Sequence, residues 1–204
     1  MLIWLVTVRA VTLVGIGVIN AARFTAGIVG IGTQARLLQQ HYHLEHVSTG
    51  ELYRKEIASG SLLGMQAKEL IDRGHLCPDK ATLDLLYQFC VSFKNARGFL
   101  LDGVPRTLEQ AKMMDGIHYP HTIPVTLAVY IKVDENEVIE RIIKRSELSK
   151  RTDDNLEVIR QRIAHYQEQI IPLVEYYKAQ SKLVEVNGMQ SVEDVFSDIC
   201  KKCL

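Results

Sequence analysis

The sequence predicts an α/β fold built on a parallel β-sheet with helices on both faces. Short apolar segments rich in Val, Ile and Leu alternate along the chain with longer amphipathic segments. Strands that alternate with helices in this way are typical of a wound parallel sheet. The length of 204 residues suits one such domain with small inserted lobes, and 47% hydrophobic residues are enough to bury a core.

The first thirty residues carry only two charges, Arg9 and Arg23, and predict a buried strand over residues 11–17. Residues 10–22 are too short for a membrane span, which takes about 20 apolar residues. The chain also lacks the positively charged opening of a signal peptide. Two alternatives stay open for residues 1–24, an atypical apolar N-terminal segment: a membrane anchor, or a segment that does not fold in the usual way.

The next elements follow from capping and glycine positions. Ser48 and Thr49 can cap a helix that begins near residue 50. Residues 55–74 are helical in character but are interrupted by Gly60 and Gly64, which predicts two helices with a turn between them. The remaining pattern predicts strands at 98–101, 125–133 and 182–188, and helices at 33–42, 78–93, 107–115, 134–145, 153–180 (with a bend near Pro172) and 191–204 (capped by Ser191).

The motif DGVPRT, Asp102 to Thr107, follows the predicted strand at 98–101. Ligands of parallel α/β sheets bind beyond the carboxyl ends of the strands. An aspartate there can hold a hydrated magnesium ion, and an arginine can clamp a phosphate. The alternative is a surface turn, because Asp-Gly and proline also punctuate turns.

Arginines gather in the second half of the chain. Phosphoryl transfer depends mostly on positioning and on neutralising phosphate charge, so several arginines in one cleft would suit it. The alternative is a solvated helix face, or pairing with Glu at i±4 as Arg141 could pair with Glu137. Spacing alone does not decide between these for Arg141, Arg145, Arg151, Arg160 and Arg162.

Four segments occur in a fixed order: HVSTGELYRKEIASGSLLGMQAKELIDRGHLCPD, GFLLDGVPRTLEQA, RIIKRSELSKRTDDNLEVIRQRI, and KLVEVNG followed by SVEDVF. Together they resemble the adenylate kinases from about Gly30 to the C-terminus, and STGELYR, DGVPRTLEQ and RTDDN are the specific parts. The resemblance implies a P-loop NTPase-like parallel sheet in a single domain over residues 1–204. It also implies a helical NMP-binding lobe inserted at 48–77 and a short lid at 146–151.

The resemblance implies an AMP site in which Arg106 clamps the phosphate and Gln110 reads the adenine edge. Gln110 and Thr49 favour AMP over the UMP or CMP of related kinases. The residues implied at this site are Thr49, Arg54, His75, Leu76, Cys77, Gly103, Val104, Pro105, Arg106, Gln110, Arg151 and Arg162.

The resemblance also implies an ATP site and a reaction, the reversible transfer of a phosphoryl group from ATP to AMP to give two ADP. Mg²⁺ would accompany ATP, near Asp102 and through water, while Asp153 and Asp154 would hold the lid and the arginines in place. The ATP-side residues implied are Gly30, Gly32, Thr33, Arg141, Arg145 and Gln190, and the catalytic residues implied are Arg106, Arg145, Arg151 and Arg162.

No zinc is expected, because the segment SELSK between Arg145 and Arg151 contains no cysteine. The four cysteines, Cys77, Cys90, Cys200 and Cys203, are expected to be free and reduced, which favours a cytoplasmic protein. A formal net charge of zero excludes the basic footprint of a nucleic-acid binder. The expected partners are therefore ATP, AMP and ADP, with no nucleic acid and no membrane, and the resemblance implies a monomer.

The chain departs from the family at its phosphate-binding loop. The family pattern is G-x-P-G-x-G-K-G-T-Q, whereas residues 25–34 read TAGIVGIGTQ. Ile31 stands where the family has lysine, and no lysine precedes Lys55. Ile28 and Val29 also obstruct the close phosphate approach that glycines allow.

Losing a charge of this kind typically costs about 10²–10³ in rate. A catalytically impaired AMP-binding homologue is therefore the alternative function. A second alternative is that residues 1–30 are not the family's own sequence, since 24 residues precede Thr25 and the resemblance begins near Gly30.

Overall fold

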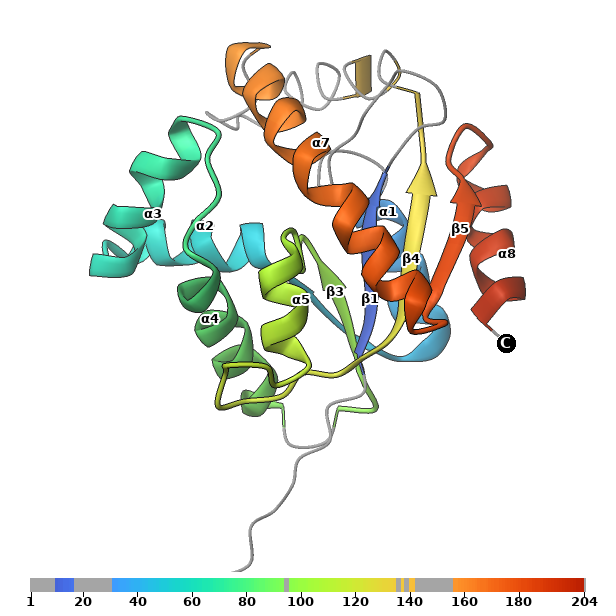
Figure 1. The fold of residues 1–204 in the computed structure, drawn as a ribbon, viewed down its shortest axis with the longest axis horizontal. Helices are drawn as coiled ribbons and strands as arrows, with labels where there is room; N and C mark the ends of the chain where they lie inside the picture. The colour runs from blue at the N-terminus through green and yellow to red at the C-terminus, as the bar shows by residue number, and fades with distance from the viewer. Residues whose placement is uncertain are drawn as a thin grey trace, which may run out of the picture.

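The structure is a computed structural model of the chain and describes residues 10–16, 31–93, 96–134, 137, 140–141 and 156–203, with the side chains of 10–16, 31, 156–167 and 203 left out of that description. Within these ranges, five strands form one parallel sheet in the order β2-β3-β1-β4-β5 (Figure 1). The predicted α/β fold with a parallel sheet is confirmed. The strands are β1 (Ala10–Ile16), β2 (Glu45–Ser48), β3 (Phe99–Asp102), β4 (Val125–Lys132) and β5 (Leu183–Asn187).

The N-terminal strand lies at the centre of the sheet. β1 pairs in parallel with β3 on one side and with β4 on the other, and Leu13 is level with Asp102. The prediction of a strand over 11–17 is therefore confirmed. Among the described residues, no helix is long and apolar enough to cross a membrane.

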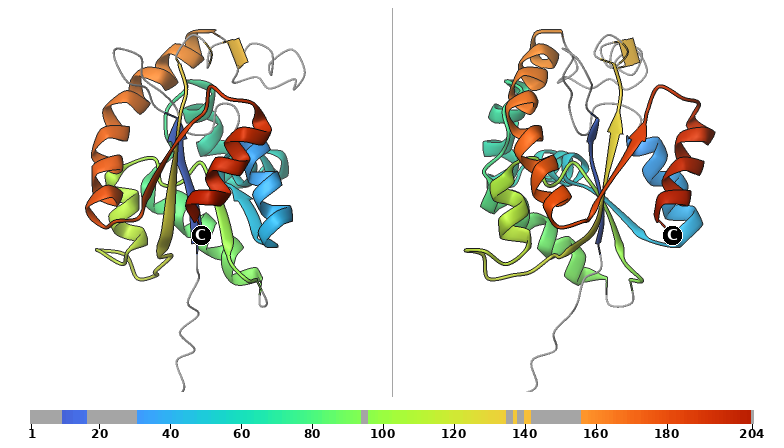
Figure 2. Two further views of the ribbon diagram at one scale, coloured as in Figure 1. Left: turned by 90° about the vertical axis from the view of Figure 1, so that its right-hand side faces the viewer. Right: turned by 45° about the vertical axis from the view of Figure 1, so that its right-hand side comes forward.

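Helices cover both faces of the sheet, as Figure 2 shows in the edge-on view. Two helices lie on one face and three on the other, which confirms the predicted layering. The first face carries α1 (Ile31–Tyr42) and α8 (Val192–Cys203), and the second carries α4 (Asp79–Ser92), α5 (Leu108–Met114) and α7 (Leu156–Ala179).

The core lies between these helices and the sheet. All four residues of β3 are buried, because a central parallel strand is covered on both faces. Leu86 of α4, Tyr177 of α7 and Ile199 of α8 are fully buried in the same cluster. The apolar run that predicted the strand at 98–101 is thus the signature of a strand with no solvent-facing side.

The C-terminal half follows its predicted elements wherever it is described. α7 continues through Pro172 as one helix. Within the range of the helix expected over 134–145, Asp134 is described and is not helical, whereas Glu137, Glu140 and Arg141 are described and are helical. The short lid expected at 146–151 and the start of the helix expected from 153 lie outside the described residues.

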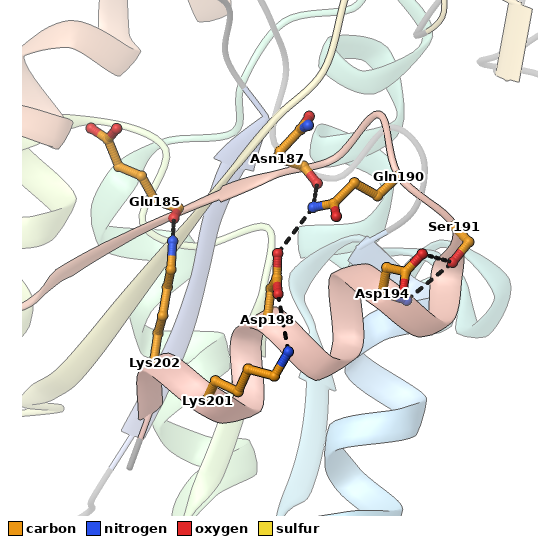
Figure 3. A network of polar contacts seen from close by, with 8 residues as sticks. All are labelled: Glu185, Asn187, Gln190, Ser191, Asp194, Asp198, Lys201 and Lys202. Carbon is orange, nitrogen blue, oxygen red and sulfur yellow. Dashed lines mark hydrogen bonds and ion pairs between the residues drawn. The ribbon is translucent and has the colours of Figure 1, made fainter.

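A network of polar contacts joins α8 to β5 (Figure 3). Ser191 caps the helix as predicted, since its Oγ accepts from the Asp194 N–H at 3.1 Å. At the other end of α8, Lys202 Nζ donates to the Glu185 carbonyl oxygen at 2.6 Å. The C-terminal end of this helix is therefore held against β5.

α2 (Thr49–Ser59) and α3 (Leu62–Asp72) form a helical pair that projects beside the sheet (Figure 1). The predicted break lies at Gly60, whose φ of 69° is the left-handed conformation that glycine adopts freely. Gly64 does not break a helix, and that expectation was wrong. It lies in the first turn of α3, where a Cβ would sit 2.2 Å from the Glu56 carbonyl oxygen. Glycine is required there because the backbones of the two helices touch.

Gly64→Ala is expected to lower the free energy of unfolding by about 1–3 kcal/mol, because the added methyl group meets backbone atoms that cannot move aside. Urea denaturation followed by circular dichroism would measure the change. The comparison variant is Gly60→Ala, where a Cβ would meet nothing within 4 Å and only the left-handed backbone is unfavourable. The free energy of unfolding is expected to fall by about 1 kcal/mol in Gly60→Ala. If Gly64→Ala lost no more stability than Gly60→Ala, the close backbone contact at Gly64 would be contradicted.

Candidate active site

The carboxyl ends of β2 and β3 meet at one edge of the sheet. Ser48 is level with Asp102 in the parallel register, so the next residues of both strands emerge side by side. Thr49 Oγ1 donates to the Gly103 carbonyl oxygen at 3.1 Å, and Arg106 Nε donates to the same oxygen at 2.8 Å. The Gly103 carbonyl oxygen therefore holds Thr49 of the STGELYR motif close to Arg106 of the DGVPRT motif.

The start of α2 corrects one detail of the sequence analysis. The helix begins at Thr49, close to the expected position, but Ser48 makes no side-chain capping bond. The Thr49 hydroxyl, which could also have capped the helix, is turned toward Gly103 instead. The sequence suggested that Thr49 caps the helix, but its hydroxyl instead makes a contact with the loop that begins at Gly103.

Gly103 adopts a conformation that only glycine adopts readily, with φ of 83°. A Cβ at this position would lie 2.8 Å from both Thr49 Oγ1 and Arg106 Nη2. The peptide bond between Val104 and Pro105 is cis, and both side chains are buried. The loop from Gly103 to Arg106 is therefore compact and holds the arginine beside the threonine.

Gln110 lies behind this loop with only 2% of its surface exposed. Its Oε1 accepts from the Arg106 backbone N–H at 2.6 Å, and its Nε2 donates to Asp79 Oδ1 at 2.8 Å. Thr107 Oγ1 donates to Asp79 Oδ2 at 3.1 Å and accepts from the Gln110 backbone N–H at 3.0 Å. The start of α5 is thereby joined to the start of α4. The sequence analysis did not assign Asp79 to the site, because an acidic residue in the first turn of a helix is also explained by the helix dipole.

Cys77 precedes α4 and is buried beside Tyr53. Burial raises the pKa of its thiol, while a hydrogen bond with the Tyr53 hydroxyl and the charge of Arg106 oppose that shift. Burial likewise raises the pKa of the Tyr53 phenol, whose hydroxyl is 2.9 Å from Thr82 Oγ1. The last residue of the segment predicted to meet a base and ribose, residues 75–77, thus lies within the electrostatic reach of Arg106.

The other residues predicted at the AMP site lie outside the hydrogen bonds described so far. The Arg54 guanidinium lies over Gly50, where a Cβ would be 3.3 Å from its Nη1. His75 and Leu76 lie in the connection between α3 and α4, with His75 exposed. Arg151 and the side chain of Arg162 lie outside the described residues.

Asp102 is the last residue of β3 and is 9% exposed. His46 Nε2, on the neighbouring strand β2, lies 3.6 Å from its Oδ2 and has no hydrogen-bond partner. The sequence analysis did not predict His46 at the site, because its position on a strand gives no sign of what lies across from it. Among the described residues, no cluster of three or more His, Cys, Asp or Glu side chains could hold a metal ion.

The first turn of α1 carries Gly32 and Thr33, and helix N-termini offer unpaired N–H groups to anions. Gln34 is 3% exposed, and its Nε2 donates to the Val192 carbonyl oxygen at 2.9 Å. This bond links the start of α1 to the start of α8. Gly30 and the side chain of Ile31 lie outside the described residues.

The other predicted ATP-side residues lie near the ends of β4 and β5. Arg141 Nε donates to Glu137 at 2.6 Å, the i,i+4 pair that the sequence suggested, and its Nη2 also reaches the Gly188 carbonyl oxygen at 3.4 Å. Gln190 Nε2 donates to the Asn187 carbonyl oxygen and to Asp198, each at 3.0 Å (Figure 3). A pocket of about 400 Å³ opens beside them, lined by Lys132, Val133, Asp134, Glu185, Val186, Asn187 and Met189. Arg145, Asp153 and Asp154 lie outside the described residues.

A parallel sheet in this order, with helices on both faces, defines the class of the fold as P-loop NTPase-like. Residues 26–182 match the adenylate kinase family, and the chain belongs to this family. The match begins before Gly30, so it includes most of the atypical loop at 25–34.

Individual relatives agree over nearly the whole chain. The adenylate kinase of Azobacteroides pseudotrichonymphae genomovar. CFP2 is 40% identical over 184 residues, which cover 90% of this chain and 96% of the relative. The adenylate kinase of Bacteroides fragilis is 39% identical over 183 residues, covering 90% and 97%. The adenylate kinase of Leptospira biflexa is 34% identical over 172 residues, covering 84% and 92%.

Thiol reagents should distinguish the cysteines of the native protein. Cys77 and Cys90 are buried and free, burial raises the pKa of both thiols, and the pKa of Cys90 reaches about 12. Because the thiolate is the reactive form, both should be alkylated slowly at pH 8 and rapidly in urea. Peptide mapping by mass spectrometry would locate the label, with the half-exposed Cys200 as the internal reference. Native labelling of Cys77 at the rate of Cys200 would contradict its burial.

Proposed function

We propose that the chain is an adenylate kinase that transfers a phosphoryl group reversibly between ATP and AMP, giving two ADP. The observation that carries the proposal is the Gly103 carbonyl oxygen, which gathers Thr49 and Arg106 at the ends of β2 and β3. Membership of the adenylate kinase family and relatives named adenylate kinase support the same activity.

On the AMP side, we assign Arg106 to the phosphate. Its Nε donates to the Gly103 carbonyl oxygen, which orients a planar guanidinium whose fork matches two phosphate oxygens. Gln110 and Thr49 favour adenine over a pyrimidine base. We assign the rest of the AMP contacts to Arg54, His75, Leu76, Cys77, Gly103, Val104, Pro105, Arg151 and Arg162.

On the ATP side, we assign the phosphates to the first turn of α1 and the base to the region between β4 and β5. Arg141 supports this assignment because it reaches from Glu137 to the loop at Gly188, beside the pocket described above. We assign the ATP contacts to Gly30, Gly32, Thr33, Arg141, Arg145 and Gln190.

Catalysis would rest on positioning and charge neutralisation, because phosphoryl transfer asks for little covalent chemistry from the protein. Arg106, Arg145, Arg151 and Arg162 would surround the transferring group, and closure around both nucleotides would exclude water. Mg²⁺ typically keeps its waters and takes one or two carboxylates plus substrate phosphates. The buried Asp102 carboxylate at the end of β3 fits that requirement, and the ion would supply additional positive charge at the phosphates. A monomer acting in the cytoplasm stays a prediction.

Turnover is expected to be slow because Ile31 provides no charge at the position of the phosphate-loop lysine. Ile31→Lys is expected to raise kcat for ADP formation by about 10²–10³, measured with a coupled assay from ATP, Mg²⁺ and AMP. Ile31→Leu, which changes shape without adding charge, serves as the control and should bring no gain. Wild-type turnover at an ordinary enzyme rate would contradict the need for this lysine, and no ADP from any of the three proteins would contradict the function.

Arg106→Lys is expected to raise KM for AMP by roughly 10- to 100-fold, because lysine keeps the charge but loses the fork and the bond to Gly103. KM for ATP should change far less, since the loop lies beyond β3 and the ATP side lies beyond β4 and β5. The matched control is Arg73→Lys, an exposed arginine that pairs with Glu69 on α3 among the described residues. Equal effects on both substrates would contradict the assignment of Arg106 to AMP.

A further inference from the structure

The amide of Gln110 is held in one orientation by two partners of opposite character. The Asp79 carboxylate can only accept hydrogen bonds, and the Arg106 backbone N–H can only donate. Nε2 must therefore face Asp79 and Oε1 must face Arg106. A rotation of the amide by 180° would set oxygen against carboxylate and N–H against N–H, in a side chain that is only 2% exposed.

Asp79 is itself held in place. Its second oxygen accepts from the Thr107 hydroxyl at 3.1 Å, so the carboxylate spans from α4 to the first residues of α5. It also stands in the first turn of α4, where a carboxylate interacts favourably with the helix dipole. The next residue, Lys80, pairs with Asp84 one turn further along the helix. Among these residues, Asp79 is thus oriented by the Thr107 hydroxyl and by its place in the first turn of α4, while the adjacent Lys80 pairs with Asp84.

The held amide still has one free position on each atom. Nε2 carries a second hydrogen, and Oε1 keeps a second lone pair. A 6-aminopurine presents the complementary pair on its Watson–Crick edge, an N6 amino donor beside the N1 acceptor, which an amide oxygen and an amide N–H match with two bonds. A 6-oxopurine presents the reverse pair there, an O6 acceptor beside an N1–H donor, so only the rotated amide would match it.

We propose that Asp79 is a positioning residue that fixes the orientation of the Gln110 amide and thereby selects a 6-aminopurine over a 6-oxopurine nucleotide. The inference rests on the proposed function, because it takes Gln110 as the reader of the AMP base. Asp79 does not touch the nucleotide. It acts by making the rotated amide, which a 6-oxopurine would need, unfavourable.

The test is a comparison of dissociation constants for AMP and IMP by isothermal titration calorimetry, without ATP. The two nucleotides share ribose and phosphate, so their ratio isolates the base edge, and the atypical phosphate loop has no part in the measurement. In Asp79→Ala the preference for AMP over IMP is expected to fall about 10-fold, because only Arg106 then opposes rotation of the amide. Asp79→Asn should keep most of the preference, since its oxygen can accept from Gln110 while its N–H₂ donates to Thr107.

The matched control is Asp84→Asn on the same helix. It alters the contacts of Asp84 with Lys80 and Tyr119, which do not involve Gln110, and should leave the ratio unchanged. If alanine at position 79 prevents folding, Asp79→Ser replaces it, because serine supports a helix start but is too short to reach Gln110. Circular dichroism would establish that each variant is folded.

Two results would overturn the assignment. A folded Asp79→Ala protein with the wild-type ratio, or one in which AMP and IMP weaken equally, would mean that Asp79 supports only the fold. A wild-type protein that binds neither nucleotide would overturn the proposed function together with this inference. Binding of AMP by the wild type therefore separates the failure of the inference from the failure of the function.

Discussion

The parallel pairing of β2 with β3 is the constraint on which the AMP side of the molecule depends. Because Ser48 is level with Asp102, the two chains leave the sheet at the same height and their next residues meet. A shift by one residue would turn every side chain of β2 to the opposite face. The hydroxyl of Thr49 would then no longer reach Gly103, and Arg106 would lose the neighbour with which it shares that carbonyl.

The order of the strands separates the two nucleotide sides. In the proposed assignment, β2 and β3 carry the AMP side, β4 and β5 carry the ATP side, and β1 lies between them. The chain passes from β1 to α1, whose Gln34 is bonded to the start of α8. The N-terminal end of α1, to which we assign the ATP phosphates, is therefore joined to a helix that is distant in sequence.

The sequence predicted best those features that are local in the chain. The glycine turn at Gly60 and the DGVPRT loop depend on adjacent residues and appear as expected. The order of strands and helices does so too, except that β2 (Glu45–Ser48) was not predicted as a strand. Asp79 could not be predicted because its partner Gln110 lies 31 positions away and its own position suits a simple helix start. Gly64 was misread for a related reason, since the carbonyl that excludes a side chain there belongs to the preceding helix.

Direct contact between the backbones of α2 and α3 has a mechanical consequence. No layer of side chains separates the two helices at Gly64, and the Ser61 hydroxyl donates to Glu56 across the same junction at 2.6 Å. The pair therefore resists shear and bending within itself. Strain between it and the sheet concentrates in the two short connections that join them, at the start of α2 and at residues 73–78.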